Sequence, residues 1–341
     1  MAQAMIRVNG REVAALTDSS MLARSNDWHQ LIATFIVNQD VKKSSRETYA
    51  KELTCFFLWV FKTERRFPDL TRTDILSYKE ALLAEGHSNL TVGNYIVTVR
   101  KFYEWAEAHK LYPNIAKGVK VPPKKQAFKK RHLSDAKSAE LIALQETKTK
   151  EYCKGRKGEK EERPVSTNIR DKAIVNLLLR CGLRCIEIVR ADIKDITFMG
   201  DRRVLKVWGK GKDSKDDFVV LTEKAWQPIK AYLATRKGAK GGEPLFVSAS
   251  RRNDGGRLTT RSVSRLCKQG LVDIGLEGRE FSAHSLRHTT AVAILKHGGS
   301  ITDVQDVLRH ANPATSEIYT ESVKDEMRLE NPSEARLDDA F

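Results

Sequence analysis

The stretch RVLKVWGKGKDSKDDFVVL, residues 203–221, decides the fold class. Its two ends, 203–208 and 218–221, are rich in β-prone apolar residues and flank the sequence GKGKDS. Two short apolar runs around a glycine-rich turn predict a β-hairpin. Apolar residues elsewhere recur every three or four positions, which is typical of amphipathic helices. We therefore expect a mainly α protein of the α+β class, with one small β-hairpin or sheet.

Helical patterns surround this hairpin on both sides. The sequence predicts helices at 134–144 and 168–189 before it, and at 223–236, 259–274, 285–297, 301–309 and 314–328 after it. Residues 147–163, between the first two helices, contain seven basic and four acidic residues and almost no apolar ones. Such a polar segment predicts a surface loop or a flexible insertion.

Four further helical patterns occupy residues 27–110 and predict a small all-helical domain. Ser44 and Ser45 are the expected caps of its second helix. Thr71 and Asp74 form a capping-box variant at the start of its third helix. Residues 1–24 show no such pattern, so we expect them to be irregular.

Residues 117–131 contain seven basic residues, no acidic ones and the pair Pro122-Pro123. Prolines oppose a helix and like charges oppose compaction, so this segment predicts an extended linker. A merely solvated tether is the alternative, but cations without a counter-charge favour contact with a nucleic-acid backbone. The predicted DNA-binding residues are Lys120, Lys124, Lys125, Lys129, Lys130 and Arg131.

These patterns predict five parts of the chain. They are an irregular segment 1–24, a helical domain 25–116, a basic interdomain linker 117–132, a second domain 133–320 and an acidic tail 321–341. Residues 320–341 carry seven acidic and three basic residues, which suits DNA poorly. This tail is either a solvated chain end or a segment that docks on another protein chain, and the sequence does not decide between the two.

The 341 residues include 60 Lys and Arg against 44 Asp and Glu, a net charge of +16. This excess indicates a polyanion as partner, without separating DNA, RNA and an acidic protein. No apolar stretch reaches the ~18 residues that span a bilayer, and residues 1–24 lack a signal-peptide core, so we expect neither secretion nor membrane insertion.

The five cysteines are scattered and form no CxxC pair, so we expect reduced thiols. Cys181 and Cys185 lie four residues apart on an expected helix. We interpret them as core residues and not as half of a metal site, because no further His or Cys follows at ligand spacing.

Four places in the second domain offer side chains that suit a phosphodiester. They are GLRCIE at 182–187, Lys210 at the hairpin tip, AHSLRHT at 283–289 and LRHANPATSEIYT at 308–320. Arginines hold the non-bridging oxygens of a phosphate and stabilise the charge that phosphoryl transfer develops. Lysine and histidine can move protons, and a tyrosine can store the bond as a covalent ester. Each motif alone is weak evidence for a phosphodiester site, whereas the order and spacing of all four together are specific evidence for one.

These motifs resemble the boxes of the tyrosine recombinase, or phage integrase, family. The resemblance covers about residues 25–320 and is most specific in the second domain, which it identifies as catalytic. The all-helical domain is similar to the SAM-like core-DNA-binding domain of the family. The resemblance implies two domains that close around a DNA duplex as a C-shaped clamp.

The resemblance also assigns a role to each matching residue. GLRCIE resembles the first arginine box, so Arg184 would bind the phosphate, and Glu187 would support the site without reacting. VWGKGKDSKDDFVVL resembles the hairpin box, so Lys210 would be the general acid toward the 5′-oxygen. Lys212 and Lys215 are weaker claimants to that role.

The two later boxes supply the remaining groups. AHSLRHT resembles the HxxR box, so His284 would handle protons and Arg287 would clamp the phosphate. LRHANPATSEIYT resembles the last box, so His310 would hydrogen-bond the phosphate and Tyr319 would attack it. Arg309 departs from the family, which usually has glycine before this histidine. It adds a cation and bears on the geometry by which the preceding helix ends.

The activity that the resemblance implies is site-specific recombination of double-stranded DNA, by cleavage and rejoining through a 3′-phosphotyrosyl intermediate. Integration, excision and dimer resolution all remain open as outcomes, in a bacterial or phage and mobile-element context. One phosphodiester replaces another, so we expect no cofactor and no metal. The sequence accordingly lacks a GxxxxGK[ST] motif and a clustered carboxylate set. We expect the protein in the cytoplasm, associated with the nucleoid.

The resemblance implies a homotetramer on two DNA sites, joined through the C-terminal tail. Leu329, Leu337 and Phe341 are the obvious anchors of that tail. Residues 1–24 are too few for a separate arm-site-binding domain, which favours a simple, Xer-like recombinase acting on core sites only. Whether an accessory protein or a second recombinase takes part is left open.

Three other readings compete with a recombinase. A type IB topoisomerase would use the same chemistry as a monomer, but the box spacing and the compact helical domain fit a recombinase better. A non-catalytic DNA-binding factor on the same fold would have no need of all six reactive side chains. An RNA-binding protein is poorly supported, because the sequence has no aromatic-rich recognition strand.

Overall fold

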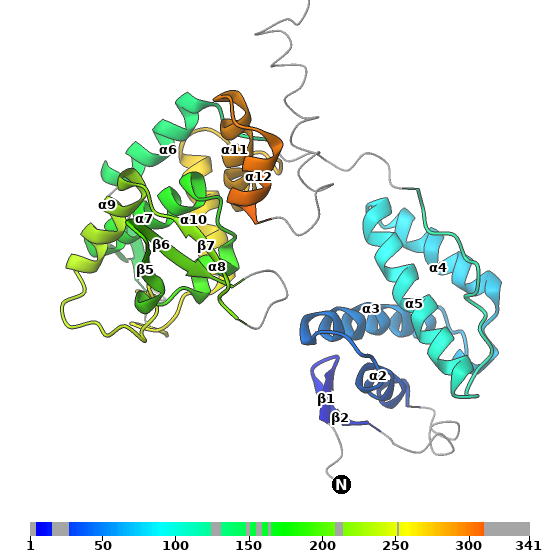
Figure 1. Ribbon diagram of the computed structural model, residues 1–341. Helices are drawn as coiled ribbons and strands as arrows, with labels where there is room; N and C mark the ends of the chain where they lie inside the picture. Colours follow the sequence, from blue (N-terminus) through cyan, green and yellow to red (C-terminus); the bar gives the residue numbers. More distant parts are fainter. Residues whose placement is uncertain are drawn as a thin grey trace, which may run out of the picture. The chain divides into compact units, whose positions relative to one another are not determined.

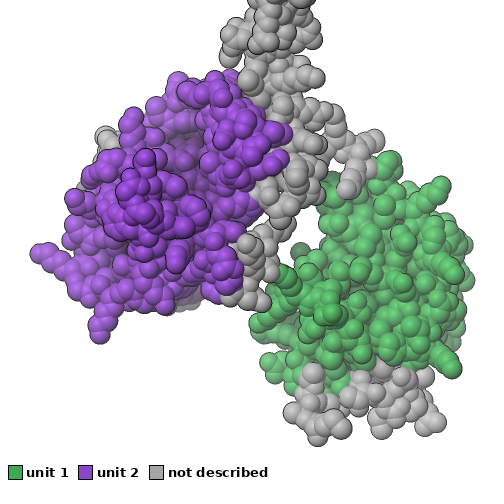
Figure 2. Space-filling view, in the orientation of Figure 1, with its two compact units in different colours: residues 1–127 green, residues 128–341 purple. Residues whose placement is uncertain are grey.

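The computed structural model describes residues 5–15, 27–123, 131–147, 151–154, 159–162, 165–208, 214–250 and 252–309. The chain divides into two compact units, residues 1–127 and 128–341 (Figure 2). The mainly α, α+β class is confirmed, because helices dominate the described residues and the strands form only small antiparallel sheets. The predicted helix 314–328, the tail 321–341 and the linker residues Lys124, Lys125, Lys129 and Lys130 lie outside the described residues.

Among its described residues, the first unit combines a β-hairpin with four α-helices (Figure 1). Its elements are β1 Met5–Val8, β2 Arg11–Ala14, α2 Trp28–Val37, α3 Lys43–Lys62, the 3-10 turn η1 Phe67–Asp69, α4 Arg72–Ala84 and α5 Asn89–Ala108. The capping box of Thr71 and Asp74 starts α4 as predicted. Ser44 and Ser45 lie inside the first turn of α3 and do not precede it. The core is aromatic, with Phe35 and Phe102 in edge contact at 5.7 Å between ring centroids.

The N-terminal residues correct one prediction. Residues 5–14, expected to be irregular, form the antiparallel β1–β2 hairpin, whose Val8 is fully buried in the core of the first unit. Asn9 and Gly10 make the turn with φ angles of +48° and +80°. Asn-Gly with two positive φ angles is a preferred two-residue hairpin connection. This dipeptide therefore indicated the hairpin, whereas the four-residue strands were too short to indicate it.

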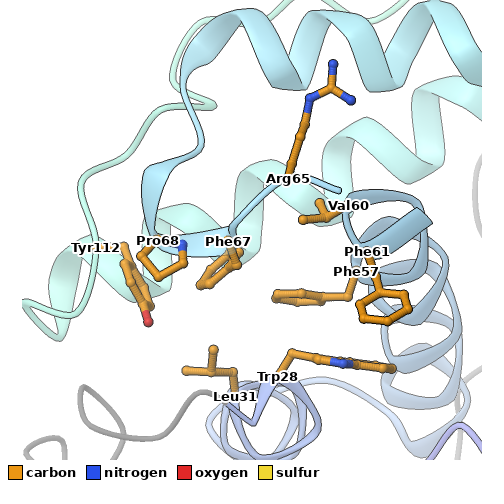
Figure 3. Close-up of a pocket in the computed structure, with 9 residues that line it drawn as sticks. All are labelled: Trp28, Leu31, Phe57, Val60, Phe61, Arg65, Phe67, Pro68 and Tyr112. Carbon is orange, nitrogen blue, oxygen red and sulfur yellow. The ribbon is translucent and has the colours of Figure 1, made fainter. Parts of the chain in front are cut away.

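A small apolar pocket in the first unit holds none of the predicted catalytic residues. Its volume is about 120 Å³, and it lies between α2, α3 and η1 (Figure 3). Its lining is Trp28, Leu31, Phe57, Val60, Phe61, Arg65, Phe67, Pro68 and Tyr112. The one charged residue there, Arg65, pairs with Asp74 at 2.8 Å between Nε and Oδ1. The pocket therefore has the character of an apolar groove and not of an anion site.

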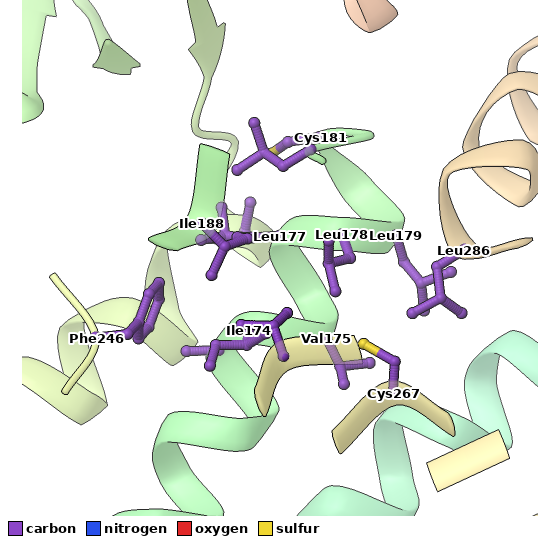
Figure 4. Packing of buried hydrophobic residues seen from close by; sticks show 14 of the residues in the cluster. Ile174, Val175, Leu177, Leu178, Leu179, Cys181, Ile188, Phe246, Cys267 and Leu286 are labelled. Atoms are coloured by element: carbon purple, nitrogen blue, oxygen red, sulfur yellow. The ribbon is translucent and has the colours of Figure 1, made fainter. Parts of the chain in front are cut away.

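The second unit packs its helices around α7. Its elements are α6 Asp135–Thr147, β3 Glu151–Lys154, β4 Glu159–Glu162, α7 Val165–Arg180, α8 Cys185–Arg190, η3 Ile193–Asp195, β5 Ile196–Met199, β6 Arg202–Val207, β7 Asp217–Val220, α9 Glu223–Ala234, α10 Thr260–Asp273, α11 Ala283–Lys296 and α12 Ile301–Leu308. Leu177 and Leu178 of α7 are fully buried in the apolar cluster that also holds Leu286 of α11 and Cys267 of α10 (Figure 4). This central helix fixes where the ends of its neighbours lie.

The predicted β-hairpin is confirmed and is part of a slightly larger sheet. Strands β6 and β7 pair antiparallel, with Leu205 opposite Val219, and both side chains face the core. A third strand, β5, adds to the free edge of β6 and was not predicted. The hairpin tip at 209–213, with Lys210 and Lys212, lies outside the described residues.

Two further predictions in this unit are wrong. Residues 151–154 and 159–162, expected as loop or flexible insertion, pair as the β3–β4 hairpin. The single helix expected at 168–189 is two helices, because α7 ends at Arg180 and α8 starts at Cys185. Gly182 between them has φ +56°, and a Cβ on it would clash with Leu308. The positive φ, together with the close approach of the Leu308 side chain, therefore favours glycine at this turn.

Candidate active site

Arg184 and Glu187 form a closed local unit at the start of α8. Arg184 is the N-cap residue, in extended conformation, and its backbone N–H donates to Glu187 Oε2 at 2.8 Å. Its Nη1 donates to Glu187 Oε1 at 2.7 Å. The Glu187 side chain is 2% exposed and that of Arg184 is 25% exposed. The first arginine box therefore lies on a turn and a helix start, with Arg184 at the surface and its carboxylate partner beneath.

Arg287 of α11 is buried, with 2% of its surface exposed. Its Nη1 donates to the carbonyl of Gly182, and its Nη2 donates to the carbonyl of Leu308. These bonds tie the turn that carries Arg184 to the last residue of α12. Arg184 belongs to the four-residue turn between α7 and α8, and Arg287, 103 residues later, is bonded to the same turn, as expected for two groups that act on one anion.

His284 lies one turn before Arg287 on α11, and its side chain is exposed. The helix is held in place by buried threonines. Thr289 Oγ1 accepts the backbone N–H of Leu133 at 2.9 Å, and Thr290 Oγ1 donates to the carbonyl of Leu179 at 2.8 Å. The Thr290 bond fixes α11 against α7, and the Thr289 bond fixes it against the segment before α6, so the backbone that carries the HxxR pair is firmly positioned.

Arg309 ends α12 in the left-handed conformation, with φ +53° and ψ +53°. Glycine adopts this conformation without strain, and Arg309 adopts it although it has a side chain, so the helix ends in the geometry of a glycine cap. The Arg309 side chain is 7% exposed, and its Nη2 donates to Glu187 Oε2 at 2.8 Å. Glu187 therefore bridges Arg184 and Arg309, a link that sequence reasoning did not find.

Two guanidinium groups, of Arg184 and Arg309, thus hold one carboxylate, that of Glu187, and a third, of Arg287, is bonded to backbone carbonyls of the same two chain segments. The excess of positive charge, at a place where Arg184 reaches the surface, suits a phosphate. Within the described ranges, no group of three or more His, Cys, Asp or Glu side chains is arranged to hold a metal ion.

The remaining predicted catalytic residues, Lys210, His310 and Tyr319, lie outside the described residues. Lys215, a weaker claimant to the lysine role, is described. It forms ion pairs with Asp192, at 3.1 Å, and with Asp195. Burial opposes ionisation of Asp192, but hydrogen bonds from Arg257 and Lys215 lower its pKa below the usual value. Lys215 therefore has a structural role in this network. Lys210 stays the predicted general acid.

The cysteines near the site are poor nucleophiles. Cys181, the residue after the end of α7, is buried, and burial raises the pKa of its thiol to about 12. Burial also raises the pKa of Cys185. Both thiols therefore stay protonated near neutral pH, and the thiolate is the reactive form.

A basic stripe on α10 was missed by sequence reasoning. Arg261, Ser264 and Arg265 are exposed and line a groove together with Cys185 of α8, next to Arg184. Lys268 lines the same groove, but its Nζ donates to the carbonyls of Glu277 and Gly278, each at 2.7 Å. The four-residue spacing of the two arginines on a helix was the available signal.

The comparisons with known proteins agree in both units. The pattern of the phage integrase family matches residues 158–326, and that of the N-terminal SAM-like domain of phage integrases matches residues 29–110. Tyrosine recombinase XerC of Corynebacterium glutamicum is 30% identical over 243 residues, which are 69% of either chain. Tyrosine recombinase XerD of Proteus mirabilis is 25% identical over 302 residues, 88% of this chain and 90% of the relative.

Solved structures share the fold. The XerH site-specific recombinase bound to a palindromic difH substrate, in a post-cleavage complex, is 19% identical, with a TM-score of 0.68 over 92% of this chain and 88% of that one. A λ integrase (75–356) dimer bound to a COC′ core site is 15% identical, with a TM-score of 0.58 over 89% of this chain and 95% of that one. Across the described ranges, no helix has the length and apolar character needed to cross a bilayer.

Proposed function

Since the chain belongs to the tyrosine recombinase, or phage integrase, family, we propose that it recombines DNA at specific sites by cleaving and rejoining strands through a 3′-phosphotyrosyl intermediate. The observation that carries this proposal is the anchoring of Arg184 and Arg287 on the turn at Gly182. These bonds fix the segments that carry Arg184 and Arg287 against each other, although 103 residues separate the two arginines, which supports a joint role at one phosphate.

In the cleavage step, the phenolic oxygen of Tyr319 attacks the scissile phosphorus. The bond from phosphorus to the 5′-oxygen breaks, and Lys210 supplies the proton that leaves a free 5′-hydroxyl. Arg184, Arg287 and His310 stabilise the charge on the non-bridging oxygens, and His284 handles protons. A 5′-hydroxyl of the partner duplex then attacks the ester and releases the tyrosine, so no nucleotide is consumed.

Phosphate contacts supply most of the affinity for DNA and position the protein on it. The linker residues Lys120 and Arg131 are exposed, which supports their predicted contact with the backbone. The arginine stripe of α10 supports a second contact region, close to Arg184. We place this activity in the cytoplasm, at the nucleoid.

Covalent trapping on a pool of duplexes tests the proposal. Each duplex carries a randomised segment and a nick placed so that the short 5′-hydroxyl strand is lost after cleavage, which makes the adduct permanent. The wild-type protein should retain DNA through a denaturing wash, and sequencing should return one site. If no sequence is enriched in covalent form, site-specific cleavage is contradicted. The recovered duplex, called the selected duplex below, serves in the experiments that follow.

Replacing both arginines of the α10 stripe, Arg261→Ala with Arg265→Ala, should weaken binding of the selected duplex. The expected loss is about 10-fold at moderate salt, and the slope of log affinity against log salt should fall by about 2, because two phosphate contacts are removed. The matched control is Lys224→Ala with Lys230→Ala, two exposed cations on α9. Equal weakening by both pairs would show a general charge effect and no contact at α10.

We further propose a homotetramer on two DNA sites, joined through residues 321–341. The net negative charge of this tail and its anchors Leu329, Leu337 and Phe341 support protein contact over DNA contact. Deleting residues 331–341 should preserve cleavage of the selected duplex and abolish the complex that pairs two duplexes, as measured by native gel electrophoresis. Unchanged pairing after the deletion would contradict a role for the tail.

A further inference from the structure

Arg309 holds a strained backbone position. Its φ and ψ are both +53°, in the left-handed region that disfavours every residue with a side chain. Its Nε is also buried without a hydrogen-bond partner among the residues that the structure describes. A glycine would satisfy the helix end without either cost, so the end of α12 does not by itself account for an arginine.

The contacts of this side chain lead to the first arginine box. Arg309 Nη1 donates to the carbonyl of Val307 at 2.6 Å, which orients the guanidinium, and Nη2 donates to Glu187 Oε2 at 2.8 Å. Glu187 holds Arg184 through Oε1 and through the backbone N–H at Oε2. The side chains of Arg309 and Glu187 are 7% and 2% exposed, so water does not compete strongly for this pair.

The carboxylate is therefore held from two sides. Without Arg309, Oε2 keeps only the Arg184 N–H, and the carboxylate can rotate about its last side-chain bond. With Arg309 in place, Oε1 stays directed at Arg184 Nη1, which sets the direction of the exposed guanidinium. Arg287 links the same two chain segments through the Gly182 and Leu308 carbonyls, so the turn and the helix end move as one piece.

We propose that Arg309 is a positioning residue, which acts through Glu187 to hold the Arg184 guanidinium in the orientation that meets the scissile phosphate. The proposal rests on the proposed function and extends it to a residue that does not touch DNA. It accounts for an arginine at a backbone position that favours glycine, because the side chain adds a second hydrogen-bond donor to Glu187 that glycine cannot provide.

The test measures single-turnover cleavage at saturating selected duplex. Arg309→Gly should slow cleavage by about 10- to 100-fold, because small misplacement of a reacting group has effects of this size, and should leave the dissociation constant unchanged. Arg309→Lys keeps a cation within reach of Glu187 and should restore most of the rate. Glu64→Gly is the matched control, since Glu64 has φ +56° and is exposed in the first unit. It relieves the same strain and should cleave like the wild type.

A double-mutant cycle separates positioning from a general effect on stability or charge. If Arg309 acts through Glu187, Arg309→Gly combined with Glu187→Gln should cleave no more slowly than Glu187→Gln alone. Multiplied losses in the double variant, or a wild-type rate in Arg309→Gly, would overturn the positioning role while the recombinase proposal stands. A wild-type protein that forms no covalent adduct would overturn both.

Discussion

Tyr319→Phe should bind the selected duplex with the wild-type dissociation constant and form no covalent adduct. Phenylalanine keeps the ring but lacks the oxygen that forms the bond to phosphorus, so the reaction has no nucleophile. The expected loss is complete to the detection limit of a denaturing gel. This is the largest effect that the account predicts for a single atom.

Three tyrosines of the first unit are poorly suited to replace Tyr319. Burial raises the pKa of the Tyr78 and Tyr103 phenols, both in the core of the first unit. Burial also raises the pKa of Tyr112, so Tyr112→Phe is the matched control, and it should form adduct at the wild-type rate. Adduct formation by Tyr319→Phe at any appreciable rate would show that the nucleophile is another residue.

Arg184→Ala should slow cleavage of the selected duplex by about 10²- to 10³-fold, because a preorganised donor to the developing charge is lost. Binding should change by less than about 3-fold, since many phosphate contacts share the affinity. The fold should be largely preserved, because Glu187 keeps Arg309 as a partner. Rapid-quench kinetics and thermal unfolding measure the two effects separately.

Arg287→Ala should lose cleavage by a similar factor and should also destabilise the protein. The buried carbonyls of Gly182 and Leu308 lose their donor, which costs about 3 kcal/mol in the free energy of unfolding. The contrast between the two arginines is the specific prediction. Equal unfolding temperatures for the two variants would contradict the structural role of Arg287, and a wild-type cleavage rate in either would contradict its role at the phosphate.

Local sequence signals predicted the elements whose causes are local. The β6–β7 hairpin followed from alternating apolar residues around a glycine-rich turn, and α4 followed from the capping box at Thr71. The β1–β2 hairpin had a local signal in Asn9-Gly10, which its short strands obscured. The β3–β4 hairpin had none, because its sequences EYCK and EKEE do not alternate between polar and apolar residues.

The break between α7 and α8 depends on a distant residue. Apolar periodicity continues from 168 to 189, and a single glycine is tolerated inside a helix, so the sequence alone favours one helix. Gly182 instead turns the chain where Leu308 packs against it, 126 residues later. A contact between residues so far apart in the sequence cannot be predicted from the sequence pattern of residues 168–189 alone.

The same distinction applies to the site. Motif order and spacing selected Arg184, Glu187, His284 and Arg287, and the structure holds the two arginines at one turn. Their catalytic roles, and those of Lys210, His310 and Tyr319, remain predictions. The burial of Arg287 and the pairing of Arg309 with Glu187 could not be read from the sequence, because they depend on how the end of α12 meets α8.

The most direct measurement of the central claim is mass spectrometry of the trapped wild-type adduct after digestion with nuclease and trypsin. Cleavage after Arg309 and Lys324 releases residues 310–324, whose only tyrosine is Tyr319. The account predicts a nucleotide attached through a phosphodiester to this peptide, at Tyr319. Attachment to any other residue, or recovery of only the unmodified peptide from covalently retained protein, would contradict it.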